Sequence, residues 1–489
     1  MIGERAVPFK VEDLDLKKFY INGQWVKAKS TRLFPVNNPA TEETVGEIVM
    51  GSVDDVNDAV LAATDALKTY SYFSKEERLG LLKKLLTLTK QRQGDLAWAM
   101  TIEMGAPITM SREAQAETGI GHLESFIRAL ESFVEKETLE SGDVVVKEAI
   151  GVCGLITPWN WPVNQIALKV IPALATGCTC ILKPSEYTPI SAFIYAELIH
   201  EAGFPPGAFN LIHGEGDVVG AALSRHPDIQ MISFTGSTRA GKAITKAASE
   251  TIKRVTLELG GKSPNILFES CDLKKSVTHA VDGCFYNTGQ SCDAPTRLIV
   301  QRSIYDDVLQ LAKLRSEEIM LGDPTEEGSH LGPLFDQIQF DRVQRMIQVG
   351  LDDGAQILVG GLGKPDGFEI GHYVKPTIFY NVHNQMRVAR EEIFGPVLVI
   401  IPFTDEEEAV RISNDTPYGL AAYLQTKDGE QARRVARALK AGSVYINGGY
   451  FNYGSPFGGV KQSGNGREGG EYGLEDYIEL KSLHGMNEF

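Results

Sequence analysis

Three residues of different chemistry stand out because each lies in a segment that suits a reactive group. Cys292 ends the polar, glycine-bearing run GQSC, whereas a structural cysteine usually lies among apolar residues. Glu258 closes an apolar run, where loss of hydration raises the pKa of a carboxyl group towards that of a useful general base. Asn160 lies between tryptophans and prolines in TPWNWP, a rigid setting for a hydrogen-bond donor. Together they make Cys292 a candidate nucleophile, although a lone cysteine is more often a core residue.

The other cysteines give no such signal. Cys153, Cys178 and Cys180 lie in strand-like apolar runs and are interpreted as core residues, while Cys271 and Cys284 offer no functional argument. The sequence contains no CxxC pair and no HExxH or other close histidine pair, so it indicates neither a disulfide framework nor a metal site. This cysteine usage is typical of a reducing cytoplasm.

Two glycine-bearing segments could bind phosphate groups. Residues 235–243 follow the run MISF and open a helix, where backbone amides and the Ser237 hydroxyl could hold phosphate oxygens. Their GxxxxGK spacing also matches a nucleoside-triphosphate P-loop, but Ala243 replaces the Ser or Thr that should hold magnesium. Residues 213–220 resemble GxGxxG with one extra residue before the last glycine. Each segment alone could equally be an ordinary strand-to-helix turn.

The segment ILKPSE places a cation, Lys183, three residues before an acid, Glu186, after another strand-like run. At the carboxyl edge of a sheet, Glu186 could accept hydrogen bonds from ribose hydroxyls, and Lys183 could donate to ribose or phosphate. The alternative is a solvated loop pair that binds no ligand.

The elements that must position these residues alternate between short β-rich runs and helical stretches. Strands are predicted at residues 152–156, 180–183, 209–213, 231–234 and 255–259. Helices are predicted between them, at residues 191–202 and 239–249. A repeat of roughly thirty residues per unit predicts βαβ crossovers and a parallel sheet, whose ligands bind beyond the carboxyl ends of the strands.

The flanking regions complete a mixed α/β pattern. Before residue 135, Ser52 with Asp55 and Ser74 with Glu77 have the spacing of helix N-caps, and apolar residues follow each at helical intervals. Beyond residue 270, further strands are predicted at residues 296–300, 356–359, 397–402 and 443–446. We therefore expect a second α/β domain after the first.

The composition is that of an ordinary globular protein. The 489 residues are 43% hydrophobic and 23% charged, and at about 150 residues per domain they predict two or three domains. The 48 Lys and Arg residues against 64 Asp and Glu residues give a net charge of −16, so neither nucleic acid nor an anionic membrane is an expected partner. The N-terminus lacks an apolar signal-peptide core, and the longest uncharged stretch, residues 149–168, carries prolines and amides that suit no membrane span.

Seven motifs follow one another along nearly the whole chain: TPWNWP, ILKPSE, FTGSTRAG, LELGGKSP, NTGQSC, EEIFGP and SPFGGVKQSGNGRE. In this order and at these separations they resemble the aldehyde dehydrogenase superfamily, and SCDAPTR is similar to a bacterial subgroup of it. The resemblance implies an α/β fold with a Rossmann-like parallel-sheet cofactor domain (1–130 and 151–257). It also implies a second α/β catalytic domain (258–472) and a small β oligomerisation extension (131–150 and 473–489).

The resemblance also implies roles for the reactive residues. Cys292 corresponds to the catalytic thiol, Glu258 to the general base and Asn160 to the oxyanion-hole amide. Lys169 matches a lysine sometimes assigned to a proton path. Attack of the thiolate on an aldehyde, hydride transfer to nicotinamide and hydrolysis of the thioester would give a carboxylic acid. Because the acid at Glu258 is present, hydrolysis is expected rather than acyl transfer to coenzyme A.

The same match implies the cofactor contacts. Lys183 and Glu186 fall on ribose contacts, Ser237 on the pyrophosphate contact, and Glu392 with Phe394 on contacts to ribose and nicotinamide. Glu186 at the ribose would repel a 2′-phosphate, which favours NAD, although some relatives with this acid also accept NADP. The expected cofactor-binding residues are Ile156, Thr157, Pro158, Trp159, Lys183, Ser185, Glu186, Gly216, Phe234, Thr235, Gly236, Ser237, Leu259, Gly260, Glu392 and Phe394.

The candidate substrate residues are mostly aromatic and uncharged. By position they are Trp161, Gln165, Leu168, Phe451 and Phe457, and some of them could instead pack in the core. This set favours a medium-sized apolar, aromatic or semialdehyde substrate, since no arginine is evidently placed to bind a second carboxylate.

Asp293 departs from the pattern of the subgroup, in which Asn follows the thiol. An anion that pointed at the nucleophile would raise the pKa of the thiol. We therefore expect Asp293 to point away from Cys292 or to pair with a cation such as Arg297.

The resemblance further implies a homodimer or homotetramer, built through edge strands near residues 131–146 and 473–483. Two other functions stay open. The first is a thiol hydrolase that uses Cys292 and Glu258 on activated esters without nicotinamide, which NAD-dependent product formation would exclude. The second is a non-catalytic binding protein, against which the joint presence of Cys292, Glu258 and Asn160 argues.

Overall fold

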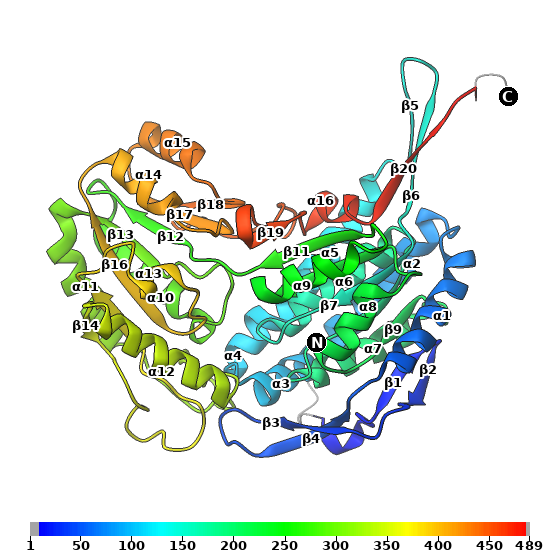
Figure 1. Cartoon of the computed structure of the whole chain (residues 1–489), viewed down its shortest axis with the longest axis horizontal. Coiled ribbons are helices and arrows are strands. Elements are labelled where there is room, and N and C mark those ends of the chain that lie inside the picture. The colour runs from blue at the N-terminus through cyan, green and yellow to red at the C-terminus, as the bar shows by residue number, and fades with distance from the viewer. Residues whose placement is uncertain (1–8, 486–489) are drawn as a thin grey trace.

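A computed structural model describes residues 9–485, in which two large sheets lie side by side and a small sheet projects at one side (Figure 1). The larger sheet has eight strands in the order β19-β11-β10-β7-β8-β9-β1-β2. Its strands are β1 (Lys18–Ile21), β2 (Gln24–Lys27), β7 (Val152–Ile156), β8 (Thr179–Lys183), β9 (Phe209–Leu211), β10 (Met231–Gly236), β11 (Arg254–Leu259) and β19 (Gly464–Asn465). The strands from β11 to β9 are parallel, which confirms the predicted parallel sheet.

Helices cover both faces of this sheet because its parallel strands are apolar on both sides. In β7, Cys153 and Leu155 belong to one buried cluster, whereas Val152 and Ile156 belong to another. The first cluster includes α2 (Lys75–Gln91), α3 (Gln93–Met104), α5 (Glu117–Ser132), α6 (Pro162–Ala175) and α7 (Pro189–Ala202). The second includes α1 (Val53–Tyr70), α8 (Ala221–Arg225) and α9 (Thr238–Ala248).

The strand order creates a switch point at β7. The chain runs from β7 outward through β8 to β9, and then returns to the other side of β7 for β10 and β11. Connections that leave in opposite directions open a crevice at the carboxyl ends of such strands. Residues 157–160, 183–186, 235–237 and 259–260 lie at these strand ends or directly after them.

The second sheet has seven strands in the order β14-β15-β16-β13-β12-β17-β18, parallel except for β14. They are β12 (Pro264–Leu267), β13 (Arg297–Gln301), β14 (Gln356–Val359), β15 (Thr377–Tyr380), β16 (Val397–Phe403), β17 (Ala421–Gln425) and β18 (Ser443–Ile446). One face packs on α10 (Leu273–Phe285) and α11 (Tyr305–Glu317). The other packs on α12 (Gln337–Asp352), α14 (Glu406–Asn414) and α15 (Gly429–Ala438). The predicted second α/β domain is thereby confirmed.

The small sheet joins β20 (Ile478–Leu483), β6 (Val144–Ala149) and β5 (Lys136–Thr138) in antiparallel pairs. It extends away from the two large sheets, and all three side chains of β5 are exposed (Figure 1). An additional hairpin is formed by β3 (Leu33–Asn37) and β4 (Thr44–Val49). Among residues 9–485, no helix has the length and apolar character needed to cross a membrane.

The predicted helix caps are present at the start of α1 and α2. The Ser52 hydroxyl accepts from the backbone N–H of Asp55, while the Asp55 carboxylate accepts from the Ser52 N–H at 2.8 Å. Ser74 and Glu77 form the same reciprocal pair at α2. Each reciprocal pair satisfies backbone N–H groups that the first helical turn leaves without partners. The predicted strands and helices of both domains agree with the structure to within two residues at each end.

The larger sheet ends at β19, which comes from the far end of the chain. Gly464 lies opposite Glu258 in this antiparallel pair, so β19 covers the edge of β11 at the candidate base. The φ angle of Gly464 is +124°, and a methyl group built on it would lie 1.9 Å from the Leu257 carbonyl oxygen. Only glycine allows the two strands to approach this closely.

We expect Gly464→Ala to lower the midpoint of thermal unfolding, because the methyl group forces β19 away from β11. Overpacking of this kind costs about 1–3 kcal/mol. Gly429→Ala is the matched control, since nothing lies within 4 Å of a methyl group at that position. Equal midpoints for the two variants would contradict this role of Gly464.

Candidate active site

A cavity of about 210 Å³ lies where the carboxyl edge of the larger sheet meets the second domain. It is lined by Pro158, Trp159, Asn160, Thr235, Gly236, Ser237, Glu258, Leu259, Gly260, Cys292, Gln339, Arg342, Glu392 and Phe394. All of these except Gln339 and Arg342 are candidate residues from the sequence. Three strand ends of the larger sheet, together with two loops and helix α12 of the second domain, thus bring the candidate thiol, base and amide together.

The loop that carries Cys292 turns sharply. Asn287, Thr288 and Gly289 have φ angles of +54°, +56° and +72°, so three successive residues are left-handed. This conformation is costly for a β-branched residue such as Thr288, whose hydroxyl is held by the Gly332 carbonyl at 3.0 Å. Gly289 packs directly on Gly395, where a methyl group would lie 2.2 Å from the Gly395 carbonyl carbon. The loop is therefore fixed against the EEIFGP segment.

Buried amides hold Asn160 against this loop. The Asn160 Nδ2 donates to the Gln290 carbonyl at 3.0 Å, and the Asn287 Nδ2 donates to the Asn160 carbonyl at 3.0 Å. The Gln115 Nε2 donates to the Asn160 carbonyl at 3.3 Å and to the Asn287 Oδ1 at 3.2 Å. All four residues are at most 3% exposed. Since an amide has two N–H donors, Asn160 can offer its second one to a ligand in the cavity.

Gln115 and Asn287 were not singled out from the sequence. Gln115 lies in a π-helical turn, Ser111–Ala116, and such turns are often found at functional sites. The sequence gives no sign of that turn. A glutamine in a helical stretch usually faces solvent, so Gln115 looks like an ordinary surface residue. Asn287 belongs to the NTGQSC motif, which was the available signal.

Glu258 ends β11 and is 5% exposed. Neither of its carboxyl oxygens has a hydrogen-bond partner. Burial raises the pKa of Glu258 well above its ordinary value, Glu468 raises it further, and Lys169 and Arg467 act in the opposite direction. Burial therefore makes Glu258 a stronger base than an exposed carboxylate, and a general base for water needs such added strength.

Lys169 lies behind Glu258 on α6. Its Nζ is 2.5 Å from the Glu468 Oε1 and 3.2 Å from the Ser233 Oγ, and the lysine side chain is fully buried. Because Glu468 and Lys169 both act on the pKa of Glu258, the three groups form one buried electrostatic cluster.

Cys292 is the cysteine that is partly exposed, whereas Cys153, Cys178, Cys180, Cys271 and Cys284 are buried. The core interpretation of the first three is confirmed. Burial raises the pKa of the Cys292 thiol well above its ordinary value, and the neighbouring carboxylates of Asp293 and Glu258 raise it further.

The expected pairing of Asp293 with Arg297 is wrong. The Arg297 guanidinium is fully buried and donates to the carbonyls of Lys262, Ile412 and Ser413 and to the Asn384 side chain, at 2.9–3.0 Å. Backbone carbonyls therefore satisfy the arginine without an acid. Asp293 instead has the largest effect of any charged group on the pKa of the thiol.

The remaining candidate cofactor residues lie along the same sheet edge. Ile156 ends β7, Phe234 lies in β10, and the Thr157 N–H donates to the Lys183 carbonyl at 3.1 Å. The Lys183 Nζ is 3.0 Å from the Glu186 Oε2. Three other candidates lie nearby in the same domain. The Ser185 hydroxyl accepts from the Tyr187 N–H, and Ser237 caps α9. Gly216 begins the helical turn Gly216–Gly220.

Glu392 faces the glycines after β11. Its Oε1 accepts from the Gly261 N–H at 3.0 Å, and a methyl group on Gly260 would overlap the carboxylate. Burial raises the pKa of Glu392 to about 7. The close approach of carboxylate and glycine backbone leaves a hydrogen-bond acceptor at the cavity wall.

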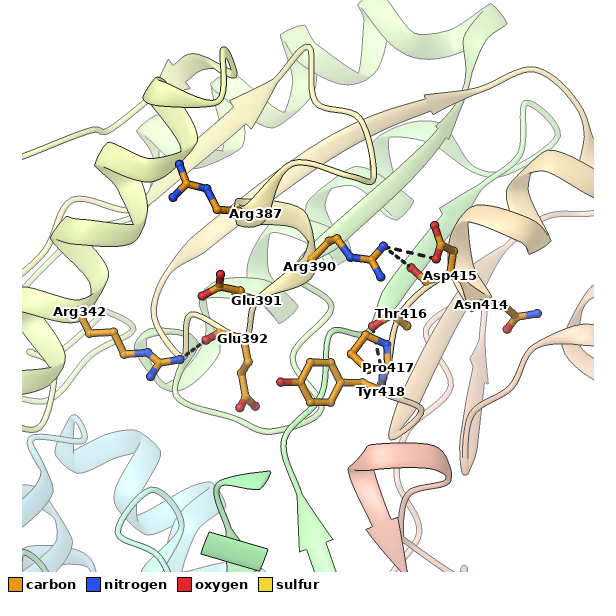
Figure 2. Close-up of a pocket in the computed structure, with 10 residues that line it drawn as sticks. All are labelled: Arg342, Arg387, Arg390, Glu391, Glu392, Asn414, Asp415, Thr416, Pro417 and Tyr418. Carbon is orange, nitrogen blue, oxygen red and sulfur yellow. Dashed lines mark hydrogen bonds and ion pairs between the residues drawn. The ribbon is translucent and has the colours of Figure 1, made fainter. Parts of the chain in front are cut away.

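Arg342 and Glu392 also line an adjoining cavity of about 680 Å³ (Figure 2). The Arg342 guanidinium donates to the Glu392 carbonyl at 2.5 Å, while Figure 2 shows the Glu392 carboxylate extending to the side of Tyr418. Across this cavity, Arg390 pairs with Asp415 at 3.4 Å. Arg342 thus anchors the backbone of the segment that presents Glu392.

The candidate substrate residues lie outside the cavity lining, on two sides of it. The Trp161 Nε1 donates to the Ser291 Oγ at 2.9 Å, next to Cys292. Phe457 precedes Gly458, where a methyl group would lie 2.6 Å from the Glu258 Oε1, and its ring centroid is 5.8 Å from that of Phe451. The other two candidates, Gln165 and Leu168, are buried in α6. Within residues 9–485, no three His, Cys, Asp or Glu side chains are placed to hold a metal ion.

Comparisons with known proteins identify the family of the chain. The model of the aldehyde dehydrogenase family matches residues 25–483. A 3-succinoylsemialdehyde-pyridine dehydrogenase from a Pseudomonas species is 48% identical over 96% of this chain and 99% of its own. The solved structure of an aldehyde dehydrogenase from Bartonella henselae has a TM-score of 0.94 and 48% identity, and covers 96% of this chain and 98% of its own. A variant of aldehyde dehydrogenase C from Pseudomonas syringae was solved in complex with NAD+ and octanal. Its structure has a TM-score of 0.95 and 46% identity, and the match covers 99% of this chain and 98% of that chain.

We expect alkylation of Cys292 by iodoacetamide to be slow at neutral pH and to accelerate about tenfold per pH unit until well above the ordinary thiol pKa, because only the thiolate reacts. The cause is the burial and the nearby carboxylates that raise the pKa of this thiol. Mass spectrometry of the protein without ligands would give the rate, with Cys292→Ala as the background. A rate that levels off below about pH 8 would contradict the raised pKa.

Proposed function

The chain belongs to the aldehyde dehydrogenase family and oxidises aldehydes with NAD, and we propose that Cys292, Glu258 and Asn160 carry out this reaction. The observation that carries the proposal is their convergence in one cavity at the carboxyl edge of the parallel sheet. A nucleophile, a base and an oxyanion donor are the three groups that oxidation of an aldehyde through a thioester requires.

In the first step Cys292 loses its proton, and the thiolate, which is the minor form at neutral pH because the pKa of the thiol is raised, attacks the aldehyde carbon and forms a thiohemiacetal. The alkoxide accepts hydrogen bonds from the free N–H of the Asn160 amide and from the Cys292 backbone N–H. The contacts of Gln115 and Asn287 orient the Asn160 amide before substrate arrives, so little reorganisation is needed as charge develops on the oxygen.

The residues of this cavity and of the adjoining sheet edge suit the binding of a dinucleotide. The Thr235 hydroxyl lies in its wall, buried and without a hydrogen-bond partner, as a group reserved for a ligand would be. Lys183 and Glu186 would hold ribose, Ser237 with the start of α9 would hold phosphate, and Glu392 with Phe394 would hold the second ribose and the nicotinamide. A bound NAD would supply the acceptor for the hydride that leaves the thiohemiacetal. The other expected cofactor-binding residues would complete this site by their places at the strand ends.

In the last step Glu258 takes a proton from water, which attacks the thioester on Cys292 and releases the carboxylic acid. The raised pKa of Glu258 makes it a base of suitable strength at neutral pH. The buried pair of Glu468 and Lys169 would then relay the proton away from Glu258.

The substrate is a medium-sized aldehyde with an apolar, aromatic or semialdehyde character. Support comes from Trp161, which bonds to Ser291 next to Cys292, and from Phe457, which precedes the glycine beside Glu258 and packs against Phe451. Gln165 and Leu168 lie on α6. Support also comes from the relatives, one of which is named as a 3-succinoylsemialdehyde-pyridine dehydrogenase and another of which holds octanal.

The small sheet would build a homodimer or homotetramer in the cytoplasm. β5 has three exposed residues and one unpaired edge, which suits strand pairing with another subunit. Residues 1–130 and 151–257 would then serve as the cofactor domain, and residues 258–472 as the catalytic domain. The free cysteines agree with a reducing compartment.

The activity is tested by NADH absorbance with a panel of aliphatic, aromatic and semialdehyde substrates. We expect wild type to turn over and Glu258→Gln to form about one NADH per active site before it stalls, because hydride transfer needs no base but hydrolysis does. Steady-state kcat should fall by about 10²- to 10⁴-fold.

Glu250→Gln is the matched control, since Glu250 is exposed beyond the end of α9. Cys292→Ala should form no NADH at all. Full steady-state turnover by Glu258→Gln would exclude Glu258 as the base that activates water.

A further inference from the structure

Asp293 places a carboxylate beside the nucleophile that none of the proposed steps uses. We propose, on the basis of the function proposed above, that Asp293 determines specificity by excluding aldehydes that carry an anionic group near the carbonyl. Among the apolar, aromatic and semialdehyde substrates proposed above, the site would then select those that are neutral near the carbonyl, or that carry an ammonium or hydroxyl group there.

The position of Asp293 is fixed on one side by two tyrosines of the second sheet. The Tyr423 hydroxyl is 3.2 Å from the Asp293 carbonyl oxygen and 3.5 Å from its Oδ2. Tyr423 and Tyr445 are register partners on β17 and β18, and their rings stack at 5.0 Å. The side chain of Asp293 is only partly buried, as are those of Ser291 and Cys292. Asp293 therefore lies in the same partly exposed stretch of the loop as the thiol.

No cation neutralises this carboxylate. Arg297, the nearest arginine in the chain, gives its N–H groups to backbone carbonyls and to Asn384. Within residues 9–485, no ion pair involves Asp293, and its polar side-chain neighbour is the Tyr423 hydroxyl. The negative charge can therefore act on whatever enters beside Cys292.

The charged groups that face the thiol from other elements are also acids. Glu258 on β11, Glu392 before β16 and Glu468 after β19 each raise the pKa of Cys292, as Asp293 does. The cations Lys169 and Arg467 lower the pKa of Glu258. The acids around the thiol therefore act on it in the same direction, and Asp293 makes the largest contribution.

Like charges a few ångströms apart in a partly buried site disfavour each other by roughly tenfold to a hundredfold in rate or affinity. An aldehyde with a carboxylate close to its carbonyl would meet this repulsion at Asp293. A neutral aldehyde would not, and an ammonium or hydroxyl group could donate to the carboxylate. Electrostatic repulsion is a common way for a site to reject the wrong ligand.

The direct test compares alkylation of Cys292 by iodoacetamide, which is neutral, and by iodoacetate, which is anionic. Both reagents attack the same thiolate, so any change in the thiol pKa cancels in the ratio of their rates. We expect this ratio to be at least tenfold larger for wild type than for free cysteine, and to fall about tenfold in Asp293→Asn. The other five cysteines are buried, and Cys292→Ala gives the background.

Asp307→Asn is the matched control, because Asp307 is exposed on α11 and should leave the ratio unchanged. Asp293→Ser serves as a second variant if Asn is not tolerated, and the comparison of wild type with free cysteine needs no variant. A wild-type ratio equal to that of free cysteine, or an unchanged ratio in both Asp293 variants, would overturn the proposal.

A kinetic arm links this result to substrate choice. The quantity measured is the kcat/KM for 4-oxobutanoate divided by the kcat/KM for butanal. We expect this ratio to rise about tenfold in Asp293→Asn, because kcat/KM rises for the anionic aldehyde and stays unchanged for the neutral one. An equal change for both aldehydes would indicate a merely structural role and overturn the proposal. Failure to form NADH with any aldehyde would refute the proposed function instead, and the alkylation ratio would still decide the role of Asp293.

Discussion

The site depends on a small set of buried amide contacts that join the two domains. Asn160, which follows β7 of the larger sheet, bonds to the loop of Gln290 and Asn287, and Gln115 bonds to both Asn160 and Asn287. A buried amide without a partner costs about 1–3 kcal/mol, so these groups are stable only in one mutual arrangement. That arrangement sets Cys292 against the carboxyl edge of the sheet and aims the Asn160 amide into the cavity.

Around this contact the site is built as an acidic, dry pocket. Burial raises the pKa values of Glu258, Glu392 and Cys292 together, and the acids reinforce one another. The same environment makes Glu258 a stronger base and makes the site discriminate between neutral and anionic substrates. Base strength and charge selection therefore arise from one cause, the exclusion of water from a cluster of carboxyl groups.

Much of the fold could be predicted from the sequence because local signals agreed with the final packing. The apolar run at residues 152–156 is a strand buried on both faces, and Ser52 with Asp55 forms the expected helix cap. The lining of the cavity followed from motifs at strand ends, which a parallel sheet must gather at one edge. The functions of the individual side chains remain proposals.

What the sequence could not provide depends on contacts between distant segments. Gln115 reaches Asn160 from a π-helical turn, and Arg342 reaches Glu392 from another helix. The pairing of Arg297 with Asp293 failed because four backbone and amide oxygens from remote segments surround the guanidinium. Spacing along the chain carries no information about such partners.

The central claim is that the amide contacts position Asn160 for the attack of the thiolate on the aldehyde. The most direct measurement is the rate of NADH formation in the first turnover of Gln115→Leu at saturating NAD, with the thermal midpoint measured in parallel. The account predicts a loss of about tenfold or more in that rate, at unchanged affinity for NAD, since a misplaced oxyanion donor costs up to about 10²- to 10³-fold. A first-turnover rate equal to that of wild type would contradict it.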